Sequence, residues 1–118
     1  MEDDLVTGGR VIRIETRGRT SGLPRSVAVG FVEDPDEAEA GTLLVAARSD
    51  ETGWARNLLA DPRCRVVLGT RRFDAIAEPL APDEHVRAIR ALIVRYGTPS
   101  EDLGRGPSFR LRPVREEP

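Results

Sequence analysis

The chain has 118 residues, of which 39% are hydrophobic, and its formal net charge is -2. This length suits one domain with a single core, and the near-neutral composition argues against a disordered chain and against a broadly basic surface for nucleic acid. All 18 residues of the Lys and Arg class are arginine, so a bound anion must be held by guanidinium groups, backbone N–H groups or hydroxyls.

The chain begins with MEDDLVTGG, which is acidic and lacks the basic and apolar regions of a signal peptide. No later apolar run reaches membrane-spanning length. Cys64 is the only cysteine, which excludes an internal disulfide and multi-cysteine zinc sites and fits a reducing compartment. We therefore expect a cytoplasmic protein without membrane insertion, whose N-terminal segment over 1–9 is loose.

Alternating apolar and polar residues predict strands over 10–17, 25–33 and 108–114. The unbroken apolar run over 42–48 predicts a strand that is buried on both faces and lies at the centre of the sheet. Two further strands flank a turn at 69–70 and form a hairpin. The residues expected to face the core are Ile12, Ile14, Thr16, Val27, Val29, Phe31, Phe109 and Leu111.

Two helices are predicted between these strands. The first covers 54–60, where Asp50 or Thr52 stands near the start and the Asp-Pro pair at 61–62 stops it. The second covers 82–97, with proline in its first turn and glycine at its end. The side chains expected to face inward are Trp54, Leu58 and Leu59 in the first helix, and Val86, Ile89, Ile93 and Tyr96 in the second.

About six strands, joined mostly by short loops, indicate antiparallel pairing. A sheet of this size in a small domain tends to close, because closure removes exposed edges. We predict a mainly β (α+β) fold in one domain over 1–118, a small β-barrel with the two helices packed on it. The tail over 115–118 is expected to be loose.

The segment over 16–25, TRGRTSGLPR, gathers three arginines in a loop between two predicted strands. Its glycines permit a positive φ and close approach to a ligand, its hydroxyls add donors, and its N–H groups can form an anion nest. Arg19 and Arg25 would supply bidentate donors to a phosphate or carboxylate. An ordinary hairpin turn with solvated arginines explains the same residues and stays open. A P-loop or dinucleotide fingerprint does not fit, because a strand follows the loop.

Three motifs in order, GRTSGLPR, VAARS and WARNLLADPRCRVVLG, resemble the deazaflavin-dependent nitroreductase family of split β-barrel flavin-binding proteins, which use coenzyme F420. The resemblance runs from about Arg10 to about Val114. It implies a split β-barrel oxidoreductase that transfers hydride from the reduced deazaflavin to a small electrophilic acceptor, such as a quinone, an enone or a nitroaromatic. The cofactor carries the hydride in such enzymes, so no catalytic residue of the protein is expected.

The resemblance also implies which residues form the site. The implied contacts to the phosphate and anionic tail of the cofactor are Arg19, Thr20, Ser21, Gly22 and Arg25. The implied lining of the deazaflavin ring is Ala47, Arg48, Ser49, Trp54 and Asn57. The resemblance places Tyr96 near the acceptor, whereas its position at the end of a helix indicates a packing residue.

Two departures from the family pattern keep other functions open. Lysines that family members often carry at Thr20 and near Ser49 are absent, and the short loop SDETG holds Asp50 and Glu51, whose charges would oppose an anionic cofactor. The alternatives are a non-catalytic barrel that binds a lipid-like or other anionic ligand, and an FMN-binding protein. We expect a monomer or a homodimer.

Three single residues have simpler interpretations. His85 stands in the first turn of the long helix beside acidic residues, which indicates a solvated position and neither catalysis nor metal binding. Cys64 is expected to be a small buried hydrophobic residue. Trp54 belongs either to the core or to the wall of a pocket. No metal site is expected.

Overall fold

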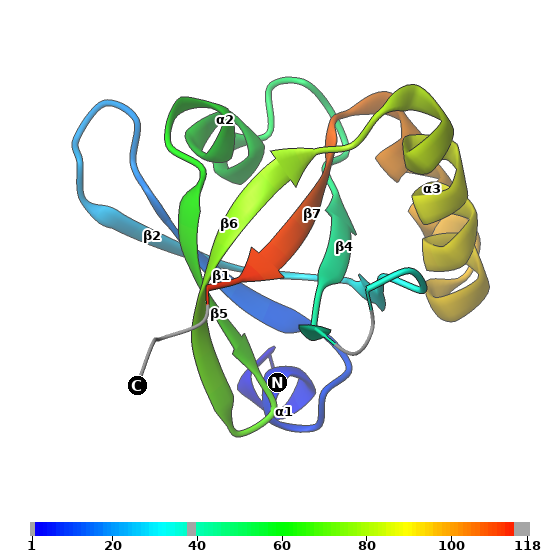
Figure 1. Ribbon diagram of the computed structural model, residues 1–118, viewed down its shortest axis with the longest axis horizontal. Coiled ribbons are helices and arrows are strands. Elements are labelled where there is room, and N and C mark those ends of the chain that lie inside the picture. The colour runs from blue at the N-terminus through cyan, green and yellow to red at the C-terminus, as the bar shows by residue number, and fades with distance from the viewer. Residues whose placement is uncertain (1, 38–39, 115–118) are drawn as a thin grey trace.

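The computed structural model describes residues 2–37 and 40–114 (Figure 1). The tail over 115–118, predicted to be loose, lies outside the described residues. None of the helices in the described part combines the length and the apolar character that a membrane span requires.

Seven strands form one antiparallel sheet in the order β2-β1-β5-β6-β7-β4-β3. The strands are β1 (Ile12–Arg17), β2 (Pro24–Val29), β3 (Val32–Glu33), β4 (Leu43–Ala46), β5 (Arg63–Leu68), β6 (Arg71–Pro79) and β7 (Ser108–Pro113). The helices are α1 (Glu2–Thr7), α2 (Gly53–Ala60), α3 (Pro82–Tyr96) and the 3-10 helix η2 (Thr98–Arg105). The sheet curls around its apolar face into a half-barrel (Figure 1). The predicted mainly β fold of split-barrel type is confirmed.

The inner face of the sheet follows from the alternation of side chains along each strand. In β1, Ile12, Ile14 and Thr16 are buried, as predicted, while the residues between them are partly or fully exposed. Ile12 and Ile14 join Phe109 and Leu111 of β7 in the core that the curled sheet encloses. The predicted hairpin is also present, because β5 and β6 pair across a turn in which Gly69 has a φ of 62°.

Strand β4 is buried on both faces, as predicted, because it has two different neighbours. Leu43 and Val45 face the enclosed core, whereas Leu44 and Ala46 pack with α3. Its predicted position at the centre of the sheet is wrong, since β4 lies between β7 and the two-residue strand β3. Burial by a covering helix and burial at a sheet centre produce the same apolar run in a sequence.

The strand predicted over 25–33 is divided in two. Its first part, β2, pairs with β1, and its last part, β3, pairs with β4 at the opposite end of the sheet order. The break falls at Gly30, where an added Cβ would lie 2.9 Å from the ring of Tyr96. The Tyr96 hydroxyl accepts a hydrogen bond of 3.0 Å from the N–H of Phe31. Tight packing against α3 therefore needs glycine at the point where the chain changes partner strand.

The two helices end as predicted, but their buried faces differ from expectation. In α2, Leu58 is buried as expected, whereas Leu59 is 57% exposed. In α3, Ile89 and Tyr96 pack against the apolar cluster as predicted, whereas Val86 is 49% exposed and the fully buried residues are Ala88 and Leu92. The reason is that η2 packs beside α3, with Leu103 in the same apolar cluster, so the covered face is set by two neighbours instead of one.

Two elements were not among the predicted ones. The N-terminal segment expected to be loose forms α1, whose Val6 is 5% exposed and whose carbonyl accepts a hydrogen bond of 3.0 Å from Gly69 N–H. This helix lies across one end of the half-barrel (Figure 1). Helix η2 fills the connection between α3 and β7. Both segments are short and polar, so neither carries the periodic apolar pattern on which a sequence-based prediction relies.

Candidate functional site

The arginine-rich loop joins β1 to β2 and projects beyond the rest of the sheet (Figure 1). Gly22 has a φ of 72°, a conformation that side-chain-bearing residues rarely adopt. Its N–H donates to the carbonyl of Gly18, and the Gly18 N–H donates to the carbonyl of Leu23, both at 2.8 Å. A Cβ on Gly18 would lie 2.7 Å from the Ser21 hydroxyl. The glycines thus allow a compact turn, which faces α2.

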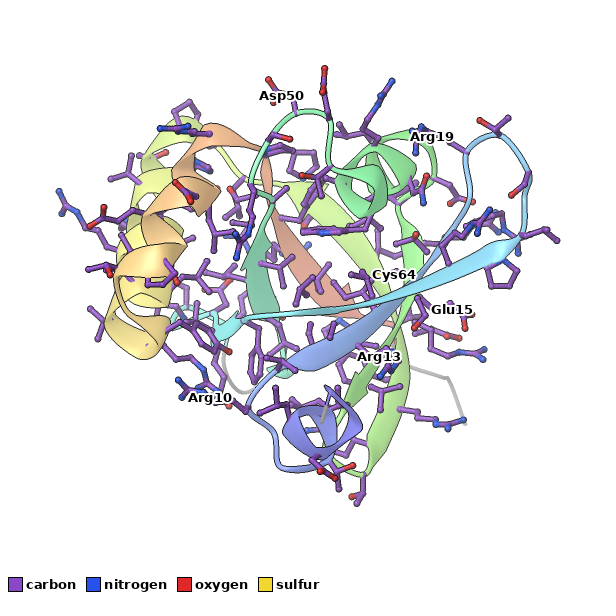
Figure 2. All side chains as sticks on the ribbon, turned by 180° about the vertical axis from the view of Figure 1, so that it is seen from behind. Arg10, Arg13, Glu15, Arg19, Asp50 and Cys64 are labelled. Atoms are coloured by element: carbon purple, nitrogen blue, oxygen red, sulfur yellow. The ribbon has the colours of Figure 1, made fainter. Side chains whose placement is uncertain are left out.

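A cavity of about 630 Å³ opens between this loop, the start of β2 and the start of α2. Six of the ten residues predicted to bind the cofactor line it: Arg19, Thr20, Ser21, Arg25, Trp54 and Asn57. The lining is completed by Thr16, Gly18, Ser26, Val27 and Gly53. Figure 2 shows Arg19 between the projecting loop and α2. Residues far apart in the sequence therefore combine guanidinium groups, hydroxyls and an indole around one space.

Arg19 is held against α2 by the side chain of Asn57. The Asn57 Oδ1 atom accepts hydrogen bonds from Arg19 Nη1 at 2.8 Å and from the Arg19 backbone N–H at 3.2 Å. The Asn57 Nδ2 atom donates to the Thr16 hydroxyl at 3.0 Å. Asn57 is 5% exposed and Thr16 is 2% exposed, so the network is buried apart from the guanidinium itself.

The other two arginines of the loop have different surroundings. Arg17 donates from Nη1 to the carbonyl of Gly22 at 3.1 Å and lies 4.0 Å from the Asp61 carboxylate, and it does not line the cavity. Arg25 lines the cavity, and no other residue in 2–37 or 40–114 forms a hydrogen bond or ion pair with its side chain. Its five N–H donors are therefore available to a ligand.

Trp54 belongs to both the core and the cavity wall. Its ring lies against the buried Phe109, with centroids 6.0 Å apart and the planes inclined by 56°. The residue is half-buried and lines the cavity. An inclined aromatic pair is a favourable geometry, so the indole is fixed in place as an apolar wall.

The remaining predicted cofactor contacts do not line this cavity. Gly22 forms the turn of the loop, and Ala47 is buried at the end of β4. Arg48 and Ser49 are exposed in the loop that leads to α2. The Ser49 N–H donates to the Thr52 hydroxyl at 3.2 Å, which shapes the start of that helix. Figure 2 shows Asp50 at the outer edge of the same loop.

Tyr96, the predicted acceptor contact, is also outside the cavity. Its hydroxyl donates to the carbonyl of Arg10 at 2.6 Å, and the guanidinium groups of Arg10 and Arg95 lie over its ring, with their central carbons 4.8 and 5.3 Å from the ring centroid. These contacts join the end of α3 to the chain before β1. The packing role indicated by its place at the helix end agrees with this geometry.

Two residues differ from the sequence-based interpretation. Thr16 is buried on the inner face of β1, as predicted, but it also lines the cavity, a role for which the only signal in the sequence is a hydroxyl at an inward position. His85 was expected to be solvated, but Nδ1 lies 2.6 Å from the buried Ser108 hydroxyl and Nε2 lies 3.2 Å from the Gly104 carbonyl. The contact partners come from η2 and the start of β7, which no local pattern reveals.

A second cavity of about 430 Å³ is lined by residues of β1, β5 and β6. Its arginines are already paired, because Arg63 contacts Asp61 at 3.0 Å and Arg65 contacts Asp74 at 3.2 Å. Cys64 also lines it, and burial raises the pKa of this thiol to about 12. The thiol is thus buried, as expected, and its burial disfavours the thiolate, while the charges here compensate one another. The larger cavity remains the candidate site.

Known proteins resemble the chain in both sequence and fold. The family model for F420H(2)-dependent quinone reductase matches residues 3–102. A quinone reductase of this type from Mycobacterium tuberculosis is 28% identical over 74 residues, which are 60% of this chain and 47% of that protein. A protein from Mycobacterium bovis that is named for the same type of enzyme matches to the same extent. The chain spans about half the length of the curated relatives it matches.

Solved structures share the half-barrel. A protein of unknown function from Agrobacterium tumefaciens is 27% identical with a TM-score of 0.74, and the match covers 89% of this chain and 48% of that one. The F420-H2 dependent reductase FDR-A is 21% identical with a TM-score of 0.70, over 87% and 94% of the two chains. At that identity the likeness shows the fold alone. The resemblance found in the motifs is confirmed by the family match, which covers most of the sequence, and the chain belongs to the F420H(2)-dependent quinone reductase family.

Proposed function

We propose that this protein binds reduced coenzyme F420 in the cavity beside the β1–β2 loop and transfers its hydride to a small electrophilic acceptor, with a quinone as the leading candidate. The observation that carries the proposal is that the Arg25 guanidinium, which has no partner among the described residues, and the half-buried indole of Trp54 line the same cavity. The family match supports the same cofactor. Enones and nitroaromatics are the other acceptors we expect.

The residues of the cavity fit a ligand that has an anionic part and a planar ring. Arg25 and the hydroxyls of Thr20 and Ser21 offer donors to a phosphate, and guanidinium groups bind phosphate in a bidentate manner. Trp54 offers an apolar wall to the ring. A volume of about 630 Å³ lies in the range common for cofactor and small-molecule sites, about 300–1,000 Å³.

The protein's own contribution is binding, orientation and exclusion of water. Bound reduced coenzyme F420 would supply the hydride, so the chain needs no nucleophile at this site, and the proton that completes the reduction of a quinone would come from solvent. Arg19 and Arg25 hold positive charge close to the bound anion, and the effect is stronger where Trp54 and Val27 keep water away. We expect this reaction to take place in the cytoplasm.

A second candidate function is the binding of an anionic ligand without redox chemistry. Asp50 and Glu51 are exposed on the loop that leads to Gly53, the first cavity-lining residue of α2, and negative charge near the cavity would oppose a polyanionic cofactor. FMN is a further possible ligand for the same donors and the same indole.

The test uses Trp54, the single tryptophan of the chain, as a fluorescent reporter. Titration with oxidised coenzyme F420 is expected to quench its emission with a Kd below about 100 μM, which corresponds to roughly 5.5 kcal/mol. Oxidation of the reduced coenzyme is then followed by absorbance with a water-soluble quinone. Binding without turnover favours the second candidate, preferential binding of FMN favours that flavin, and no binding of either overturns the proposal.

A further inference from the structure

Asn57 occupies the position where α2 meets β1 and the β1–β2 loop. Its carboxamide oxygen accepts two hydrogen bonds from Arg19, and its carboxamide nitrogen donates one to Thr16. The orientation of the amide is fixed by chemistry, because the two Arg19 donors can be met only by an oxygen. With 5% of its surface exposed, Asn57 offers little to a ligand directly.

Arg19 differs from the arginines of this protein that form ion pairs, because its side chain is held by uncharged acceptors. Arg63 is fixed by the Asp61 carboxylate, and Arg110 by the carboxylates of Asp34 and Glu84, so each of those positive charges is compensated. The acceptors of Arg19 are the neutral amide of Asn57 and, at 3.4 Å, the carbonyl of Gly53. Its guanidinium is therefore oriented while its charge remains uncompensated.

We infer that Asn57 is a positioning residue that orients the Arg19 guanidinium toward the anionic part of the bound cofactor without neutralising it. This inference rests on the proposed function, because it assumes an anion in the cavity. A fixed guanidinium loses less conformational entropy on binding than a free one, and a neutral acceptor preserves the full attraction for phosphate. Thr16 completes the arrangement by holding the amide nitrogen from the side of β1.

The test compares two ligands by equilibrium titration of the full chain. One is oxidised coenzyme F420, and the other is a deazaflavin analogue that lacks the phosphate and the acidic tail. Asn57→Asp keeps the size of the side chain and the oxygen that accepts from Arg19, but adds a negative charge beside that guanidinium. Asn57→Ala removes the hydrogen bonds to both Arg19 and Thr16. We expect each variant to bind the coenzyme about tenfold more weakly or worse, with less than about a twofold change for the analogue. Arg56→Ala, an exposed arginine on the same helix that does not line the cavity, should change neither affinity.

A double-mutant cycle tests whether Asn57 acts through Arg19. In an Arg19→Ala background, Asn57→Ala should change the coenzyme affinity by less than about twofold. Equal losses for both ligands, undiminished losses in the Arg19→Ala background, or coenzyme binding by Asn57→Asp at the native affinity would each overturn the inference. If the unmodified protein binds neither ligand, the proposed function itself fails, and that outcome is distinct from the others. If Asn57→Ala does not fold, Asn57→Asp decides the question alone.

Discussion

Arg110 of β7 donates a hydrogen bond of 2.8 Å to the carboxylate of Asp34, in the turn after β3. Asp34 is 2% exposed, and the same guanidinium also pairs with Glu84 in the first turn of α3. One side chain therefore joins three segments that lie far apart in the sequence. These residues are remote from the candidate site and contribute to the stability of the half-barrel.

Replacement of Arg110 should strongly destabilise the fold. Arg110→Ala leaves the buried carboxylate of Asp34 without its cation, so we expect the free energy of unfolding to fall by about 3–5 kcal/mol. Urea denaturation followed by circular dichroism measures the change. The matched control is Arg87→Ala, because Arg87 and Asp83 form an exposed pair 3.9 Å apart. For this variant we expect the free energy of unfolding to fall by about 0.5 kcal/mol or less. Similar losses in the two variants would contradict a special role for Arg110.

The pair of Glu84 and Arg110 should make stability depend on pH in the acid range. The hydrogen bond from Arg110 lowers the pKa of the Glu84 carboxyl below its ordinary value of 4.5. The folded protein thus binds this proton less readily than the unfolded chain, so the pair stabilises the fold above about pH 4.5 and loses that effect as the pH falls further. Urea midpoints between pH 7 and 3 should decline more steeply in the native protein than in Glu84→Gln. Equal slopes would show that the pair does not contribute.

Arg25 and Arg17 should differ in their effect on cofactor binding, although both belong to the β1–β2 loop. Arg25→Ala should weaken the binding of coenzyme F420 by about tenfold or more, because it removes the unpaired guanidinium of the cavity. Arg17→Ala should have less than about a twofold effect, since Arg17 binds the Gly22 carbonyl. Fluorescence titration of Trp54 gives both affinities. Equal weakening would indicate that the total charge of the loop, and not its geometry, controls binding.

Tyr96→Phe separates a packing role from an acceptor role. The variant loses the hydroxyl that donates to Arg10 and accepts from Phe31, so we expect a loss of about 1–3 kcal/mol in the free energy of unfolding. Affinity for the coenzyme and the KM for a quinone should not change, because Tyr96 does not line the cavity. A higher KM without loss of stability would instead support the contact with the acceptor that the family resemblance implied.

Cys64 should react slowly with thiol reagents. Burial raises the pKa of its thiol to about 12, so very little thiolate exists at pH 8 in the folded protein. Reaction with a chromogenic disulfide should proceed only through opening of the fold, and urea should restore the rate of an ordinary cysteine. A rapid reaction in native buffer would mean that the sulfur is accessible from the 430 Å³ cavity.

The local pattern of residues was sufficient for much of the architecture. Alternation in β1 identified Ile12, Ile14 and Thr16 as buried, and the turn beginning at Gly69 located the hairpin. The three motifs in their order along the chain led to the correct family. Such features depend on neighbours within a few residues, because backbone conformation and side-chain direction repeat with a short period. The strands and turns can therefore be predicted without knowledge of the rest of the chain.

The sequence by itself thus determined most of the strands, the glycine-dependent loop and the residue types available to bind an anion. Only the tertiary structure decided that the chain breaks at Gly30 under the ring of Tyr96, and that Arg25 rather than Arg17 remains unpaired beside Trp54. Only it brought Asn57 to Arg19, 38 positions away. The hydrogen-bond partners of a side chain and the buried face of a helix depend on which distant segments come into contact. Those contacts form only when the sheet curls and the helices pack on it.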